Sequence, residues 1–202
     1  MLERWPEALV RFQTEFERVG GVLHRVATRA EVPGVVAAIA GERGARELVT
    51  WAPAAMGLDL AGPLGAAGLG VSPAPAGGGE AERVAHRGAA AAAGVGVTGA
   101  DWAVAETGSL VLVSGAGRPR TTSLLPETHV AIFGPGQLLE SLEQAGVMLE
   151  ALHADGGAGL SGSMVNVITG PSRTADIELT LTRGVHGPRE VHAVFVEEGV
   201  GA

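Results

Sequence analysis

Residues 94–113 read GVGVTGADWAVAETGSLVLV. Three short apolar runs in this stretch, Val95 to Val97, Trp102 to Ala105 and Leu110 to Val113, are typical of β-strands. A segment of strong helix formers, Glu80 to Ala93, comes directly before them. A helix that leads into buried strands indicates an α/β domain.

The same alternation continues on both sides of this stretch. Helical patterns are found in residues 1–20, 31–40 and 137–153, and strand-like runs in residues 22–26, 47–51, 130–133, 164–169 and 191–196. The last two runs are almost continuously apolar, as strands buried on both faces usually are. The sequence therefore predicts a single α/β domain over residues 1–202, with an N-terminal helix in residues 1–20.

One segment interrupts the alternation. Residues 52–79 contain four prolines and eight glycines. Proline lacks a backbone donor and glycine favours irregular backbone, so we expect an irregular loop here, apart from a short strand around residues 69–71. A connection of this length is either a lid or binding loop, or an Ala/Gly/Pro-rich filler.

The composition excludes several kinds of chemistry. The 202 residues include no cysteine and no lysine. Without cysteine the chain has no thiolate nucleophile and cannot ligate an iron–sulfur cluster, and without lysine it can form neither a Schiff base nor a Walker P-loop. The formal net charge of −8 argues against nucleic-acid binding. We expect neither a secretory leader nor a membrane span, and hence a cytoplasmic protein.

Two familiar patterns fail when their context is considered. Gly94, Gly96 and Gly99 have the spacing of a dinucleotide-binding loop, but a helix precedes them and a strand follows, which is the reverse of the required order. Glycines that relieve a tight helix-to-strand turn explain the match better. The six histidines are scattered without ligand spacing, so we predict no metal site and no cofactor held by this chain; the alternative is a metal site assembled in space from distant histidines.

Glu106 is the ionisable residue of an otherwise apolar run over residues 103–113. An unpaired buried carboxylate is energetically costly, so Glu106 either reaches solvent at a strand end or serves a site. It is therefore a candidate catalytic carboxylate, and the alternative is a solvated turn residue.

The loop from Ser114 to Pro126 is a candidate anion site. Its charges are Arg118 and Arg120, so it carries +2 within a chain of −8. Guanidinium groups, glycine NH groups and hydroxyls such as that of Ser123 together suit a carboxylate or a phosphate. The alternative is a basic loop that faces water.

A second candidate site follows the strand-like run of residues 164–169. Ser172 and Arg173 lie in a polar turn of the kind where open α/β sheets bind ligands. Asp176 can orient the arginine, or instead cap the next element. In the following turn, residues 184–190, His186 is a candidate proton carrier.

Several ordered blocks resemble the signatures of the LUD domain family, and most closely those of its lactate utilization protein C group. The blocks are residues 100–108, 123–126, 170–178 and 184–189. The resemblance implies a three-layer sandwich similar to the NagB/RpiA/CoA-transferase fold, with a mostly parallel central sheet and helices on both faces. It also implies iron–sulfur partner proteins that oxidise L-lactate to pyruvate together with this chain.

Three functions follow as hypotheses. The first is a non-redox component of a lactate-oxidising complex, with a small carboxylate or another anion bound by Arg118, Arg120 and Arg173. The second is a transferase or ligase acting on acyl-CoA, because Glu106-Thr107-Gly108 resembles the Glu-x-Gly motif of CoA-transferases. The third is a metabolite sensor that binds without turnover. Isolation as a lone homo-oligomer, without iron–sulfur partners, favours the second.

Overall fold

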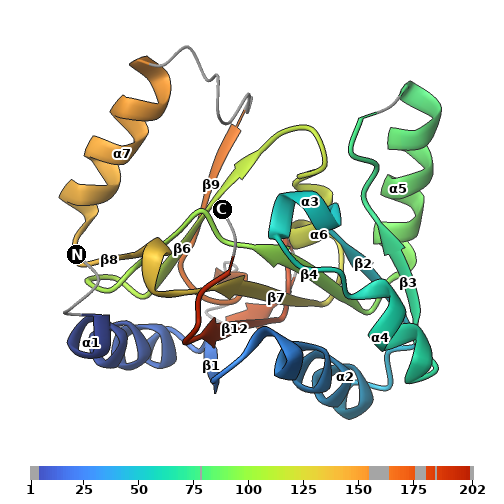
Figure 1. Cartoon of the computed structure of the whole chain (residues 1–202), viewed down its shortest axis with the longest axis horizontal. Helices are drawn as coiled ribbons and strands as arrows, with labels where there is room; N and C mark the ends of the chain where they lie inside the picture. Colours follow the sequence, from blue (N-terminus) through green and yellow to red (C-terminus); the bar gives the residue numbers. More distant parts are fainter. Residues whose placement is uncertain (1–4, 78, 155–163, 176–180, 185, 201–202) are drawn as a thin grey trace.

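The centre of the molecule is a six-stranded parallel sheet in the order β1-β12-β7-β4-β2-β3 (Figure 1). The computed structural model describes residues 5–77, 79–154, 164–175, 181–184 and 186–200. The strands of the central sheet are β1 Val22–Val26, β2 Glu47–Thr50, β3 Gly70–Pro73, β4 Val95–Gly99, β7 Thr128–Phe133 and β12 Glu190–Val196. The inner strands β7 and β12 are apolar along most of their length because helices or a second sheet cover both of their faces.

Helices lie on both faces of this sheet. On one face α2 (Val32–Glu42) packs beside α4 (Ala61–Ala66), and on the other α5 (Glu80–Ala92) packs beside α6 (Thr121–Leu124). The β1-to-β2 and β3-to-β4 crossovers run in opposite directions across the sheet, and right-handed crossovers then place α2 and α5 on opposite faces. The predicted three-layer α/β architecture is confirmed.

A second sheet of four strands follows β4 along the chain. Its order is β8-β5-β6-β9, with β5 Trp102–Val104, β6 Ser109–Ser114, β8 Leu138–Leu139 and β9 Met164–Ile168. Strand β6 is antiparallel to both β5 and β9, and one side of the sheet packs against α7 (Leu142–Ala154). A hairpin of β10 (Arg173–Ala175) and β11 (Leu181–Arg183) follows β9. The run at residues 164–169 thus belongs to this mixed second sheet and not to the central one.

The N-terminal helix α1 (Trp5–Arg18) lies against the carboxyl ends of β7 and β12. Its apolar side is aromatic: the ring of Phe12 lies 5.2 Å from that of Phe133, and the ring of Trp5 lies 5.1 Å from that of Phe195. Tilted and edge-on aromatic pairs at this separation add to the stabilisation from burial alone. Of the helix expected in residues 1–20, the part over residues 5–18 is therefore present and is an integral part of the core, and residues 1–4 lie outside the described residues.

Residues 52–79 are more regular than expected. They contain the helices α3 (Pro53–Met56) and α4 where an irregular loop was expected, and the edge strand β3 confirms the short strand expected around residues 69–71. Pro53 is the first residue of α3. An NH group at this position would have no acceptor within the helix, so proline, which lacks one, is tolerated there. Gly57 ends the helix with a φ of 64°. The prolines and glycines of this segment thus mark the ends of short elements. Two 3-10 turns elsewhere, Arg29–Glu31 and Pro135–Gln137, complete the regular structure.

Gly96 allows α6 to approach the central sheet closely. A Cβ atom on Gly96 would overlap the carbonyl oxygen of Thr122, and would also press on Pro126. Gly94 lies in the short turn between α5 and β4. Within the glycine spacing that resembles a dinucleotide-binding loop, Gly96 therefore serves helix-to-sheet packing.

Candidate functional site

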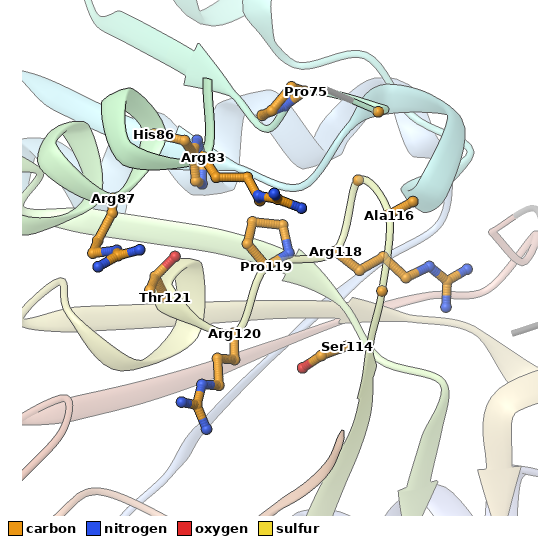
Figure 2. A pocket seen from close by; sticks show the side chains of 13 residues that line it. Pro75, Arg83, His86, Arg87, Ser114, Ala116, Arg118, Pro119, Arg120 and Thr121 are labelled. Carbon is orange, nitrogen blue, oxygen red and sulfur yellow. The ribbon is translucent and has the colours of Figure 1, made fainter. Parts of the chain in front are cut away.

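A cavity of about 530 Å³ lies between α5 and the loop of residues 115–120, beyond the carboxyl ends of β2 and β3 (Figure 2). Ligands of open α/β sheets bind at this edge. Four arginines and no acidic residue are among the described residues that line it. Its main polar side chains are Arg83, His86 and Arg87 from α5, and Arg118, Arg120 and Thr121 from the loop and the start of α6. We call this cavity the arginine pocket.

The loop of residues 115–120 is fixed to the chain that follows β2. The NH group of Ala52 donates to the carbonyl of Gly117 at 2.8 Å, and the indole NH of Trp51 donates to the carbonyl of Pro119 at 3.3 Å. Gly117 has a φ of 71°, which few residues other than glycine adopt. One wall of the arginine pocket is therefore held in place by backbone contacts.

Arg118 is engaged by Asp101, which lies in the turn between β4 and β5. Its Nη1 lies 2.5 Å from Oδ1 of Asp101, and its guanidinium lies 5.5 Å from the centre of the Trp51 ring. Burial raises the pKa of Asp101, whereas the NH group of Val113 and the charge of Arg118 act to lower it. Figure 2 shows Arg118 pointing away from the arginines of α5. The charge of Arg118 is thus largely compensated within the protein.

The other three arginines carry the positive charge of the pocket. Nη2 of Arg83 lies 3.3 Å from Oε2 of Glu80, but both side chains are largely exposed, so this pair is weak. Within the described part of the chain, neither Arg87 nor Arg120 forms an ion pair. Arg120 donates to Sδ of Met164 at 2.9 Å. None of these three arginines has a buried counter-ion among the described residues, so each can bind an anionic ligand.

His86 lies buried on the inner side of α5. Its Nε2 lies 3.1 Å from Oγ1 of Thr122, so the imidazole connects α5 to α6. Burial lowers the pKa of His86, which makes the ring neutral at pH 7. The sequence patterns did not single out His86, Arg83 or Arg87 as site residues. Their spacing, which puts all three on one side of a helix, is the signal that could have identified them.

Ser123 does not face the arginine pocket. Its side chain is 1% exposed, and its Oγ donates to the carbonyl of Arg120 at 3.0 Å. The predicted anion contact of Ser123 is therefore replaced by a bond within the first turn of α6. Thr121, two residues earlier, lines the pocket instead.

Arg173 lies at a different place from Arg118 and Arg120. Its guanidinium donates to the carbonyl of Val19 at the end of α1, and it is not among the residues that line the arginine pocket. The reason is the direction of β9, which runs antiparallel to β6. The turn after β9 lies beside the start of β6, whereas the loop of Arg118 follows its end. The expectation that the three arginines share one pocket is wrong.

The other residues predicted around Arg173 remain near it. The NH group of Ser172 donates to the carbonyl of Pro188 at 2.9 Å, which joins this turn to the one that contains His186. The side chain of His186 is exposed. Asp176 lies outside the described residues.

Glu106 is exposed and caps a helix. Its Oε2 accepts a hydrogen bond from the NH group of Leu142 at 2.9 Å, at the first turn of α7. The first NH groups of a helix lack partners within the helix, and a negative charge at this end is favourable. Glu106 is not among the residues that line the arginine pocket.

His129 and His192, which are buried, and His24, which is partly buried, form a second group of ionisable side chains. Nε2 of His24 lies 3.0 Å from Nδ1 of His192, and Nε2 of His192 lies 3.5 Å from Oε2 of Glu190. Burial is the main cause that lowers the pKa of both histidines. Nearby, His129 is completely buried, with its Nε2 2.9 Å from Oγ1 of Thr98, and burial lowers its pKa to about 3. Among the described residues, no three such side chains are placed to hold a metal ion.

Comparison with known proteins identifies the family of the chain. A family model described as LUD domain matches residues 9–196. The chain belongs to the LUD domain family. Lactate utilization protein C from Exiguobacterium sp. is 43% identical over 114 residues, which are 56% of this chain and 49% of the relative. The protein of that name from Halalkalibacterium halodurans is 41% identical over 119 residues, 59% and 50% of the two chains.

These relatives are longer than the region they share with this LUD domain. The chain spans about half the length of the curated relatives it matches. A crystal structure of a DUF162 family protein from Deinococcus radiodurans covers 95% of this LUD domain and 98% of its own chain, with a TM-score of 0.64. At 21% sequence identity, this similarity establishes the fold. Within the described residues, no helix is both long and apolar enough to cross a bilayer.

Proposed function

We propose that this LUD domain is a non-redox component of a lactate utilization system, and that it binds a small carboxylate or another anion in the arginine pocket. The relatives named lactate utilization protein C, at 43% and 41% identity, support the lactate system. The observation that carries the anion site is a cavity with four arginines and no acid among its described lining residues.

The charge of the arginine pocket contrasts with that of the whole chain. The formal net charge of the chain is −8, yet Arg83, Arg87 and Arg120 lie around one cavity without a buried counter-ion among the described residues. An arginine fork binds a carboxylate through two parallel hydrogen bonds. A cavity with this lining favours anions over neutral or cationic ligands.

The oxidation of L-lactate to pyruvate releases two electrons, which need an acceptor. The chain has no cysteine with which to hold an iron–sulfur cluster. In the proposed system, iron–sulfur partner proteins carry these electrons, and this chain contributes ligand binding.

Growth on L-lactate tests the proposal. The gene is deleted in its own cell and replaced by the wild type or by a variant with both Arg87→Gln and Arg120→Gln. Arg18→Gln is the matched control, because Arg18 is an exposed arginine of α1 that pairs with Glu15. We expect the wild type and Arg18→Gln to restore growth on L-lactate and the double variant not to. Normal growth of the deletion strain on L-lactate would contradict the lactate role, and normal growth of the double variant would contradict the role of the pocket.

Partner proteins are tested by affinity purification of the full chain from cells grown on L-lactate. We expect cysteine-rich iron–sulfur subunits in the purified material. Recovery of the chain as a lone homo-oligomer would contradict the complex.

A further inference from the structure

We infer that the ligand of the arginine pocket carries a diphosphate, or two phosphate groups close together. This inference rests on the proposed anion site and names the chemical class of its ligand. It follows from the number of arginines without a buried counter-ion among the described residues, from their placement on two walls, and from the size of the cavity.

The pocket has more positively charged arginines than a small monocarboxylate can neutralise. Arg118 is compensated by Asp101, which leaves Arg83, Arg87 and Arg120. One carboxylate, such as that of lactate, would neutralise one of these cations, and the other two would have no counter-ion beyond the exposed pair of Arg83 with Glu80. A diphosphate carries enough charge to pair with all three, and its oxygens accept hydrogen bonds from several guanidinium forks at once.

The arginines on α5 are arranged at a helical spacing that is unfavourable without a ligand. Arg83 and Arg87 are four residues apart, so they lie on the same side of the helix, where like charges repel. Figure 2 shows Arg83 reaching toward the loop that contains Pro119, and Arg87 lying opposite Thr121. A bound polyanion between these walls would remove the repulsion, and the Thr121 hydroxyl can donate a hydrogen bond to it.

The volume of the cavity points to a ligand larger than lactate. Sites for cofactor-sized and drug-sized molecules typically occupy about 300–1,000 Å³. The arginine pocket, at about 530 Å³, lies within this range. A three-carbon acid would fill a small part of it. A diphosphate, alone or within a nucleotide, is larger and presents oxygens at both phosphate groups, which suits a cavity with arginines on both α5 and the loop of residues 115–120.

Isothermal titration calorimetry of the full chain at low salt tests this inference, with inorganic pyrophosphate, ADP, L-lactate and pyruvate as four separate ligands. We expect pyrophosphate or ADP to bind at least about tenfold more tightly than L-lactate or pyruvate. The pyrophosphate and ADP titrations distinguish a free diphosphate from one carried by a nucleotide, and tight binding of either supports the inference. Added salt should weaken the binding, because the contacts are ionic and partly exposed.

Variants show where the diphosphate binds. Arg83→Gln and Arg87→Gln should each weaken pyrophosphate or ADP binding by about fivefold or more, whereas Arg18→Gln should leave it unchanged. Circular dichroism checks that each variant is folded, which we expect because these side chains are exposed. The inference is wrong if pyrophosphate and ADP do not bind, if L-lactate binds as tightly as they do, or if neither α5 variant weakens binding.

These results separate the ligand class from the lactate role. Loss of growth on L-lactate in the Arg87→Gln, Arg120→Gln variant, together with binding of L-lactate alone, would keep the proposed function and overturn the diphosphate. If pyrophosphate binds tightly but deletion of the gene leaves growth on L-lactate intact, the diphosphate inference is kept and the lactate role is overturned.

Discussion

The carboxylate of Asp101 lies 2.5 Å from the guanidinium of Arg118, and this contact joins the turn after β4 to the loop that forms one wall of the arginine pocket. The two side chains are 8% and 17% exposed, so neither charge is well solvated. Asp101 also accepts a hydrogen bond from the NH group of Val113 at 2.7 Å. The pair therefore holds together three segments of the chain.

Arg118→Gln should destabilise the protein, because it leaves the carboxylate of Asp101 buried without a counter-ion. Removing one partner of a buried pair typically lowers the free energy of unfolding by about 3 kcal/mol. Urea denaturation measures the loss, and Arg18→Gln, on the surface of α1, should change the value by less than about 0.5 kcal/mol. The double variant Asp101→Asn, Arg118→Gln should be more stable than Arg118→Gln alone. Equal stability of Arg118→Gln and the wild type would show that the contact contributes nothing.

Gly96→Ala and Gly88→Ala should have opposite effects on stability. The new methyl group at Gly96 meets the carbonyl of Thr122, so α6 must move from the sheet, which costs about 2 kcal/mol or more. Gly88 lies within α5, and a Cβ atom added there would meet no other group within 4 Å, so alanine should stabilise the protein by about 0.5–1 kcal/mol. Thermal unfolding distinguishes the two, and a neutral Gly96→Ala would contradict the close approach of α6.

The stability of the protein should fall as the pH decreases below about 6.5. The pKa of His129 is about 3 in the folded protein and 6.5 in the unfolded chain, so the unfolded state takes up a proton first. The free energy of unfolding is then at its full value above pH 6.5 and decreases below it by up to about 1.4 kcal/mol per pH unit. The lowered pKa values of His24 and His192 act in the same direction.

Urea denaturation at about pH 7.5 and about pH 5.5 measures this dependence on pH. In His129→Gln, which keeps a polar group near Thr98 but cannot be protonated, the difference between the two values should be smaller than in the wild type. His153→Gln, on the exposed side of α7, is the control and should behave as the wild type does. An unchanged pH dependence in His129→Gln would show that His129 is not responsible.

Glu106→Ala should lower stability without loss of growth on L-lactate. It removes the acceptor for the NH group of Leu142 at the start of α7, which costs about 1 kcal/mol.

Incubation of the wild type with an acyl-CoA, followed by intact-mass analysis, should yield no glutamyl adduct. An adduct that forms in the wild type and is absent from Glu106→Gln would instead support the transferase hypothesis.

The α/β class could be predicted from the sequence because the long apolar runs are typical of buried strands. The run at residues 191–196 can be little other than a buried strand, and it forms β12. The prediction for residues 52–79 was wrong because helices of four and six residues, α3 and α4, are too short to show a periodic pattern. Prolines and glycines lie at the ends of these short helices. Their role as helix ends can be recognised only after the positions of the helices are known from the structure.

The candidate site depended more on tertiary structure. Arg118 and Arg120 could be found because they lie close together in one loop. Arg83 and Arg87 could not, because packing of α5 beside α6 is what brings them to the same cavity. The placement of Arg173 was wrong because the apolar run at residues 164–169 resembles a central strand, whereas its pairing with β6 depends on contacts distant in sequence.

The position of β12 has a consequence for how the chain is made. This strand is late in the sequence, yet it lies between β1 and β7 and forms the hydrogen bonds that join them. During translation β1 emerges from the ribosome first, and its partner in the sheet follows only when residues 190–196 have been synthesised. Until then β1 and one edge of β7 are unpaired, a state in which nascent strands aggregate or recruit chaperones. The central sheet is therefore completed after nearly all of the described chain has left the ribosome.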